Sequence, residues 1–253
     1  MARLRAARFD ERLTLVEHLD ELRTRIIVSI AVLVVAIGLC FWQNHLLLEL
    51  MNNPLPAGKT PITLSPTEPF LTTFKISAYA GIIIALPILL YQVYAFLLPA
   101  LSPVEKRVIV PFLVLVPILF IAGVVFGYFV VLPAAIKFLL NFNSDQFHVQ
   151  VRASEYYGFA TMTLLAMGLV FQVPMAILAV TRLGIVSVDQ LRKNRRYAYL
   201  ILAIVAMLLP GTDPITMLVE LAPLLVLYEL SIVLARVFGR PVTPAEPSAG
   251  EAG

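Results

Sequence analysis

The stretch at positions 108–132, VIVPFLVLVPILFIAGVVFGYFVVL, decides the fold of this 253-residue chain. Its 25 positions contain no charged residue. At about 1.5 Å of helical rise per residue, they cover the roughly 30 Å of a bilayer's hydrocarbon core. A backbone that is exposed to lipid must satisfy its own hydrogen bonds, which a helix does within one segment. The stretch therefore predicts a membrane-spanning helix.

Five further apolar runs accompany this stretch. With 60% hydrophobic and only 14% charged residues, the chain has too little polar surface to coat a soluble globule, so lipid must be its main solvent. The fifth run would form only about 18 Å of helix, so it must thin the membrane or lean on its neighbours. We expect an all-α, polytopic membrane protein with six transmembrane helices. The runs lie at 26–42, 70–98, 108–132, 156–183, 198–209 and 215–235.

Lys and Arg are divided unevenly between the two sides of the membrane that these helices define. Fifteen of them fall before the first run, around the links that follow the second and fourth runs, or after the sixth run. Only Lys59, Lys75, Lys137 and Arg152 fall on the other side. Basic flanks remain in the cytoplasm, so both termini are predicted to be cytoplasmic. The net charge of +3 thus reflects topology, and we expect no nucleic-acid partner.

Three regions follow from this topology. We expect a cytoplasmic amino-terminal region with an interfacial helix over 1–25, a six-helix transmembrane domain over 26–235, and a disordered cytoplasmic tail over 236–253. The tail is rich in Pro, Gly, Ala and Glu, a composition that cannot bury enough apolar surface to fold. Acidic residues precede the first run and no small-residue cleavage site follows it, which argues against a removable signal peptide.

Prolines interrupt several of the apolar runs. Each removes a backbone donor and tends to bend its helix. Bent helices leave room for a concave bundle, although membrane helices carry proline often in any case. We expect a concave bundle with a short fifth helix. The prolines within the runs are Pro87, Pro111, Pro117, Pro174 and Pro223.

Catalytic and cofactor motifs are missing from the sequence. It contains no Gly-rich phosphate loop, metal-binding His pair or nucleotide motif. An intramembrane serine protease needs a nucleophile and a histidine that face each other within the bilayer, but His18, His45 and His148 fall in links or at the ends of runs. We therefore predict no enzyme activity, no cofactor and no metal site.

Glu21 is the first acid with two interpretations. It lies just before the first run, where it would point toward the lipid headgroups, and Arg25 follows one helical turn later. On this segment alone, the sequence favours an internal i,i+4 ion pair over a binding site. An apolar stripe on the same segment is typical of a helix at the membrane surface. The stripe consists of Leu15, Leu19, Leu22 and Ile26.

Glu105 is the second such acid. Ser102, Pro103 and Glu105 match the cap, first and third positions of a helix start, which would explain the carboxylate structurally. A carboxylate on a short loop at the lipid boundary, near Phe96, is equally suited to bind an incoming cation. The residues themselves leave both interpretations open.

Polar residues also occur within or beside the later runs. Gln172 lies within the fourth run, where it could face a cavity or satisfy the carbonyl that Pro174 frees. Glu229 lies near the cytoplasmic end of the sixth run and could extend to the headgroups. Asp213 precedes Pro214 and is expected to cap the sixth helix.

Several of these segments together resemble the TatC family, the multispanning subunit of the twin-arginine protein translocase. The similarity covers residues 14 to about 238, and the motifs occur in the family's order. The matching segments are HLDELRTR at 18–25, PILLYQVYAFLLPAL at 87–101 with its Glu105, FQVP at 171–174, and DQLRK at 189–193.

The resemblance implies a receptor for signal peptides that carry two consecutive arginines and belong to proteins exported after folding. It places Glu21, Arg23, Phe96 and Glu105 in the signal-peptide site. Guanidinium meets a carboxylate through two parallel hydrogen bonds, whereas lysine offers only a point charge. The resemblance also marks Pro54, Pro99 and Asp213 as structural or functional positions.

At Gln172 the sequence departs from the family, which often has glutamate there. A neutral amide can form hydrogen bonds within the bilayer but cannot carry a proton. The resemblance further implies single-span partners of the TatA and TatB type, self-association, the proton gradient as energy source, and a bacterial cytoplasmic membrane as location. Gln172 is therefore expected to be an intramembrane polar site that does not titrate.

A secondary transporter or channel for a small solute is the alternative function. Such carriers often consist of two related halves with interrupted helices, and the first three runs show no convincing repeat in the last three. The two functions differ in where the critical acids lie. A receptor requires them at the membrane surface, and a carrier requires them near the midplane.

Overall fold

The structure is a computed structural model that describes residues 15–56, 58–97, 114–147, 149–182, 185–211 and 213–238. Within these residues the regular elements are helices, and extended backbone pairs only at an isolated bridge between Ile62 and Arg152. The elements are α1 (Leu15–Trp42), α2 (Asn44–Asn52), α3 (Glu68–Leu97), α5 (Leu115–Phe126), the π-helical turn η2 (Gly127–Val131), α6 (Leu132–Asn141), α7 (Ala153–Val170), α8 (Val173–Arg182), α9 (Val188–Lys193), α10 (Arg195–Leu208) and α11 (Pro214–Phe238).

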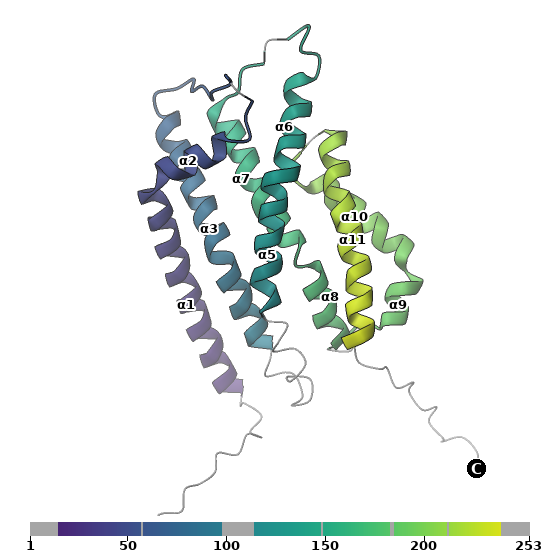
Figure 1. Cartoon of the computed structure of the whole chain (residues 1–253). Coiled ribbons are helices and arrows are strands. Elements are labelled where there is room, and N and C mark those ends of the chain that lie inside the picture. The colour runs from purple at the N-terminus through teal and green to yellow at the C-terminus, as the bar shows by residue number, and fades with distance from the viewer. Residues whose placement is uncertain are drawn as a thin grey trace, which may run out of the picture.

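These elements cross the molecule six times, as α1, α3, α5–η2–α6, α7–α8, α10 and α11 (Figure 1). In this view α1 begins and α3 and α11 end at the lower end of the bundle, and α2 lies at the upper end. Five of the crossings are long and apolar enough to span a membrane. The remaining crossing, α10, is the fifth along the chain and has only 14 residues. This confirms the short fifth helix predicted from the sequence.

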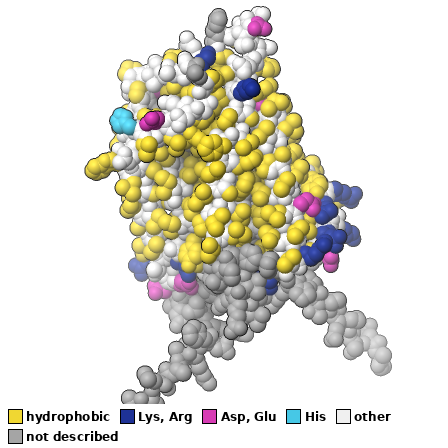
Figure 2. All heavy atoms as spheres, in the orientation of Figure 1, with side chains coloured by type: hydrophobic (Ala, Val, Ile, Leu, Met, Phe, Trp, Pro, Cys, Tyr) yellow, Lys and Arg dark blue, Asp and Glu magenta, His cyan; other side chains and the backbone are white. Residues whose placement is uncertain are grey.

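A band of hydrophobic side chains covers the middle of the face shown in Figure 2. Charged side chains gather toward the upper and lower ends, on either side of this band. A chain with this surface is an integral membrane protein, because only lipid tails can cover such a band without cost.

Three of the crossings differ from the predicted runs. α1 is one continuous helix from Leu15 to Trp42, so the expected interfacial segment is not a separate helix within the described residues. The third crossing continues past 132 to Asn141, because Pro133 takes one of the first positions of α6, where its missing N–H costs little. α11 extends to Phe238, three residues into the predicted tail. The rest of that tail lies outside the described residues.

The fourth crossing is broken where the sequence predicted one helix. α7 ends at Val170 and α8 begins at Val173. At the break, the amide of Gln172 donates to the carbonyl of Leu169, only three residues back, at 2.9 Å. Pro174 explains this break, since it has no N–H to donate to the carbonyl of Val170, four residues back, at which α7 ends.

α2 was not predicted. Its nine residues follow α1 almost directly and carry polar ends around the apolar centre 46–48, too short a pattern to stand out from the first run. Two tyrosines of α7 hold it in place. Tyr156 donates its hydroxyl to the carbonyl of Met51 at 2.5 Å, and Tyr157 donates to the side-chain oxygen of Asn52 at 2.8 Å.

Glycines allow two pairs of helices to pack closely. A Cβ on Gly81 of α3 would lie 2.6 Å from the Cα of Ile37 in α1. A Cβ on Gly123 of α5 would lie 2.5 Å from the carbonyl oxygen of Met167 in α7. Small residues at membrane helix interfaces allow such close backbone approach. These close α1–α3 and α5–α7 contacts fix the positions of the helices that carry the side chains at the lower end.

Candidate functional site

Arg25 joins the lower ends of α1 and α3. Its Nε and Nη2 donate to Oε1 of Glu21 at 3.0 and 2.5 Å, and its Nη1 donates to Oε1 of Gln92 at 2.8 Å. Both partners of the ion pair are only about a quarter exposed, at 23% for Arg25 and 25% for Glu21. The i,i+4 pair that the sequence favoured is thus confirmed, and it extends to a second helix through an amide 67 residues away.

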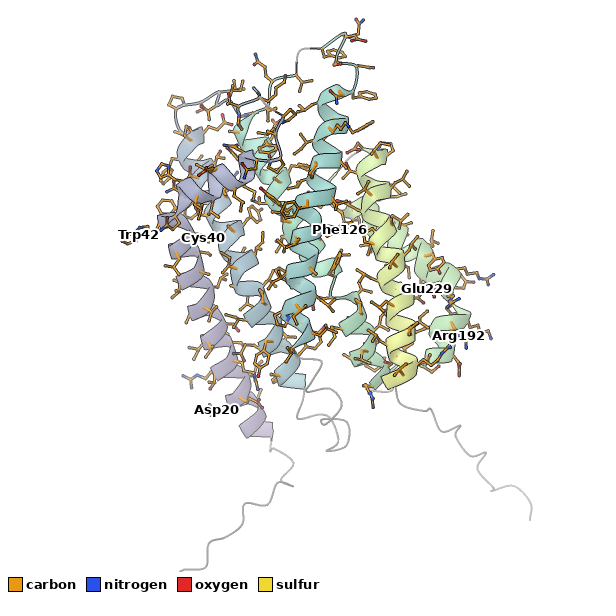
Figure 3. The ribbon with its side chains drawn as sticks, in the orientation of Figure 1. Asp20, Cys40, Trp42, Phe126, Arg192 and Glu229 are labelled. Carbon is orange, nitrogen blue, oxygen red and sulfur yellow. The ribbon has the colours of Figure 1, made fainter. Side chains whose placement is uncertain are left out.

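A hollow of about 460 Å³ opens beside this bridge. Asp20 is exposed at its edge, on the part of α1 nearest the lower end (Figure 3). Two carboxylates and one guanidinium face the hollow, so its wall carries one more negative than positive charge. Such a wall attracts a cation, and the half-buried position reduces screening by solvent. The lining residues are Asp20, Glu21, Thr24, Arg25, Val28 and Gln92.

The remaining residues predicted for this site are only partly accounted for. Arg23 is exposed on α1, two residues from Glu21. Phe96 is half-buried in the last turn of α3, one turn beyond Gln92. Glu105 and Pro99 lie outside the described residues, in a segment that follows the lower end of α3 in sequence. The assignment of Glu105 therefore stays a prediction.

Pro54 lies at the opposite end of the molecule. It is half-buried in the turn that follows α2, where the amide of Leu55 donates to the carbonyl of Asn52 at 3.0 Å. A proline suits such a turn because its φ is already fixed. Its observed setting is structural, and it does not contact the lower-end site.

Gln172 is buried at the break between α7 and α8, with an exposed fraction of 6%. Its Nε2 donates to the carbonyl of Val116 in α5 at 3.1 Å. The sequence interpretation that this amide satisfies the carbonyl freed by Pro174 is therefore wrong, because the amide bonds across to another helix. Its Oε1 is buried and accepts no hydrogen bond within the described residues.

Asp213 caps α11 as predicted. Its Oδ1 accepts from the amide of Thr216 at 2.8 Å, and its Oδ2 accepts from the hydroxyl of Thr216 at 2.5 Å. Gly211, just before the cap, has a φ of +143° and touches the same threonine side chain, which leaves no room for a Cβ. The cap thus depends on one acid and one glycine.

For two acids of α11, the sequence did not indicate the surroundings that the structure shows. Glu229 does not simply extend to the headgroups: Arg195 donates to it at 2.7 Å and Tyr199 at 2.5 Å, which joins α11 to α10. Glu220 is fully buried, and neither carboxyl oxygen has a hydrogen-bond partner within the described part of the chain. The sequence showed this acid but gave no reason to expect complete burial.

Glu68, at the upper end, was missed altogether. It is 5% exposed and accepts hydrogen bonds from the Nε of Arg152 at 2.9 Å, the hydroxyl of Ser154 at 2.6 Å and the amide of Leu64 at 2.8 Å. The bond to Glu68 raises the pKa of the Arg152 guanidinium above its usual value. The only signal in the sequence was the position of Glu68 just before the second apolar run, since an acid there suits a helix start.

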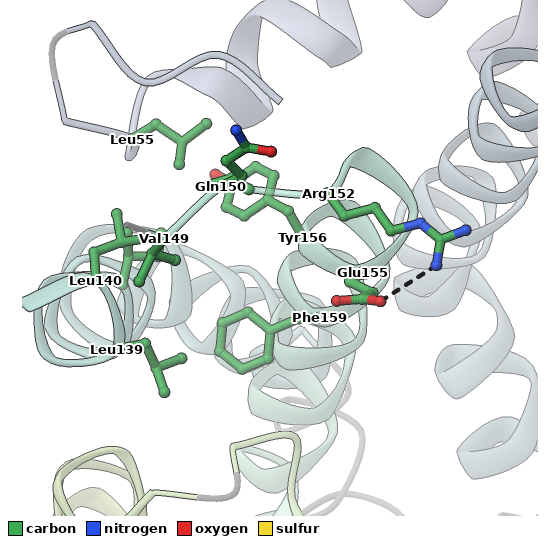
Figure 4. Close-up of a pocket in the computed structure, with 11 residues that line it drawn as sticks. Leu55, Leu139, Leu140, Val149, Gln150, Arg152, Glu155, Tyr156 and Phe159 are labelled. Atoms are coloured by element: carbon green, nitrogen blue, oxygen red, sulfur yellow. Dashed lines mark ion pairs between the residues drawn. The ribbon is translucent and has the colours of Figure 1, made fainter. Parts of the chain in front are cut away.

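A second hollow lies next to this ion pair, between α6, α7 and the segment before α7 (Figure 4). Its volume is about 240 Å³ and its lining is largely apolar, with Leu139, Tyr156 and Phe159 among the residues that face it. Arg152 and Glu155 lie at its edge and form an ion pair of 3.5 Å. In the described residues, no group of three or more His, Cys, Asp or Glu side chains could hold a metal ion.

The fold and the lower-end surface define a polytopic α-helical membrane protein with a hollow lined by two acids at one end of its bundle. Residues 17–223 match the family model described as Sec-independent protein translocase protein (TatC). The chain belongs to the TatC family.

Similar proteins and structures agree with this assignment. The TatC protein of Desulforapulum autotrophicum is 37% identical over 249 residues, which cover 97% of this chain and 92% of that protein. The TatC protein of Aquifex aeolicus is 36% identical over 231 residues, covering 89% and 96%. The crystal structure titled Twin Arginine Translocase Receptor TatC superposes with a TM-score of 0.76 at 35% identity, covering 88% of this chain and 100% of that one. The chain is therefore a protein-translocase component and not an enzyme.

Proposed function

We propose that this protein is the receptor and core subunit of a twin-arginine translocase, which binds signal peptides with two consecutive arginines and helps to export their folded cargo. Membership of the TatC family supports the general role. The observation that carries the binding step is the acidic hollow of about 460 Å³ at the lower end, between α1 and α3.

The chemistry of this hollow suits arginine better than lysine. A guanidinium is planar, remains charged at any relevant pH and can form two parallel hydrogen bonds with one carboxylate. Asp20 and Glu21 lie next to each other on the wall, and Glu21 already binds one guanidinium, since the Nε and Nη2 of Arg25 both donate to its Oε1. A peptide with two guanidinium groups would extend this arrangement to a second acid.

The ion pair between Glu21 and Arg25 gives Glu21 and Glu105 different roles. Because Arg25 holds Glu21 against α3, the main role of Glu21 is to shape the hollow and keep it negative. Glu105, which follows α3 in sequence, would then provide the principal contact to the arginine pair. Phe96, half-buried at the end of α3, would contact the apolar residues of the signal peptide beside the arginines.

Orientation and partners complete the proposal. The lower end would face the cytoplasm of a bacterium, since the basic flanks gather there and such flanks stay inside. Single-span subunits of the TatA and TatB type and further copies of this chain would dock against the apolar band. The electrical part of the proton gradient supplies about 2.3 kcal/mol per charge per 100 mV, which would drive transport.

Photo-crosslinking tests the binding step. A signal peptide with a photoreactive group beside its arginine pair is incubated with membranes that contain the chain or a variant. Glu105→Ala should reduce crosslinking at least tenfold, because each hydrogen bond to a charged group contributes about 1.5–3 kcal/mol. Glu21→Ala should reduce it less. Glu155→Ala is the matched control, because it removes an acid that is 75% exposed at the upper end. If the peptide crosslinks equally to the Glu105→Ala variant and to the control variant, the proposal is refuted.

A further inference from the structure

A dense group of cations lies where α9 turns into α10. Four of the five positions at 192–196 are basic, and all four of these side chains are exposed. In Figure 2 they form the concentration of Lys and Arg at the right-hand edge of the molecule. We call Arg192, Lys193, Arg195 and Arg196 the α9–α10 basic patch.

The patch is mounted rigidly. α9 begins with a reciprocal cap: the backbone amide of Gln190 donates to the Ser187 hydroxyl at 3.1 Å, and the side-chain Oε1 of Gln190 accepts from the backbone amide of Ser187 at 2.9 Å. The hydroxyl of Tyr228 in α11 donates to the carbonyl of Leu191 at 3.0 Å. These contacts hold the backbone of the short helix against the bundle, so its cations start from a fixed position.

The depth of the patch is unusual for so many charges. Arg195 bonds to Glu229, and α11 continues from there for nine residues to Phe238, which is about 13 Å of helix. That part of α11 exposes apolar side chains, among them Val233 at 56% and Val237 at 65%, and a charged side chain is exposed only in its last turn, at Arg236. Figure 3 accordingly places Arg192 nearer the middle of the bundle than Asp20. The patch thus lies at a depth where the neighbouring helix faces lipid tails.

The length of α10 explains how charges reach this depth. Its 14 residues span about 21 Å, against the roughly 30 Å of a hydrocarbon core. The neighbouring helices that the structure describes leave α10 open to lipid, since Leu200 is 60% and Leu208 80% exposed, so a bilayer must become thinner around this short helix. The headgroups of the lower leaflet must then approach the start of α10, where the cations of the α9–α10 basic patch lie.

We propose that the α9–α10 basic patch binds the phosphate of an anionic phospholipid, whose acyl chains lie along the lower part of α11. Two of the four cations are engaged elsewhere: Arg195 bonds to Glu229, and Arg196 stacks at 4.8 Å on the ring of Tyr197. Arg192 and Lys193 have no hydrogen bond or ion pair with any residue that the structure describes. These two side chains carry the site.

The surroundings favour a lipid over a soluble anion. Tyr197 is 54% exposed beside the patch, and aromatic side chains of this kind occur at the level of the headgroups. Exposed apolar residues of α11 continue directly below the patch and can pack against acyl chains. A soluble phosphate would use the cations but leave this apolar surface uncovered.

Native mass spectrometry of the full chain in detergent tests the proposal, with phosphatidylglycerol as the probe and phosphatidylcholine as the uncharged comparison. Each cation near a membrane surface contributes about a fivefold preference for anionic lipid. The double variant Arg192→Gln, Lys193→Gln should therefore bind phosphatidylglycerol about thirtyfold more weakly. The matched control is Lys75→Gln, Lys137→Gln, which removes two exposed cations outside the patch and should change binding less than twofold.

Four results would overturn the proposal. One is an equal loss of lipid in the control variant, and another is equal binding of the two lipids by the unchanged chain. The third is displacement of phosphatidylglycerol by millimolar inorganic phosphate, which would place a free anion in the patch. The charge-preserving variant Arg192→Lys, Lys193→Arg guards against misfolding. It should keep lipid binding within about twofold, and a loss as large as that of the glutamine variant would also contradict the proposal.

Discussion

Replacing Gly81 by alanine should force α1 and α3 apart. An ideal Cβ on Gly81 lies 2.6 Å from the Cα of Ile37 and 2.7 Å from its backbone nitrogen. Because these are backbone atoms, no side-chain rotation relieves the clash. The two helices must separate by about 0.8 Å to restore an ordinary contact of 3.4 Å, and the frame that holds Arg25 against Gln92 moves with them.

The size of the effect follows from a comparison with Gly38. A Cβ on Gly38 of α1 meets no atom within 4 Å. Both substitutions gain about 1 kcal/mol of helix propensity, so this gain cancels when the two variants are compared. What remains is the cost of overpacking, about 1–3 kcal/mol. Gly38→Ala should thus be neutral or stabilising, and Gly81→Ala should be less stable than Gly38→Ala by that amount.

Equilibrium unfolding of the full chain in mixed micelles measures this difference, followed by circular dichroism. The same preparations can be tested for signal-peptide binding, which Gly81→Ala should weaken because the wall of the acidic hollow is displaced. If Gly81→Ala and Gly38→Ala unfold at the same denaturant concentration, the close approach of α1 and α3 does not exist as described.

Gln172→Glu should leave transport within about twofold of the unchanged chain if no proton is carried at this position, and a transport assay in membrane vesicles at pH 6 and pH 8 measures it; a strong new pH dependence would contradict this. Glu68→Gln should lower the thermal unfolding temperature because it weakens a buried acceptor of several hydrogen bonds, whereas Glu155→Gln, an exposed acid, should not; equal melting curves would count against the upper-end ion pair. Asp213→Ala should destabilise the protein by about 1–2 kcal/mol through loss of the α11 cap, measured by chemical unfolding, and Asp213→Asn should recover most of this loss.

Features that depend on neighbouring residues were predictable from the sequence. The apolar runs located the six crossings because hydrophobicity over some 20 residues is what a bilayer selects. The Asp213 cap and the Glu21–Arg25 pair involve residues three and four positions apart, which helix geometry brings together without help from the rest of the fold.

Features that depend on tertiary contacts were not predictable. The sequence left two roles open for the side chain of Gln172, facing a cavity or serving its own helix, and did not indicate its partner Val116, which lies 56 residues away in another helix. Glu68 and Arg152 are 84 residues apart, and no local pattern connects them. The break at 171–172 was hidden because both halves of the crossing are apolar, and hydropathy does not register a missing hydrogen bond.

The candidate site combines both kinds of feature. Glu21 was identified because its segment is acidic and matches the TatC family, but its bond through Arg25 to Gln92 became visible only in the fold. Glu105 remains a prediction from the sequence. Its role rests on the family resemblance and on the acidic hollow between α1 and α3, because Glu105 follows α3 in the sequence.

The affinity of the full chain, reconstituted in nanodiscs, for a twin-arginine signal peptide and for its twin-lysine counterpart shows whether the lower end is a diarginine receptor. Fluorescence anisotropy on both peptides gives the two dissociation constants under identical salt. We expect at least a tenfold preference for the arginine peptide, about 1.4 kcal/mol, because only guanidinium can form paired hydrogen bonds with a carboxylate. Equal affinities would mean that the lower end recognises charge alone, which would contradict the proposed receptor.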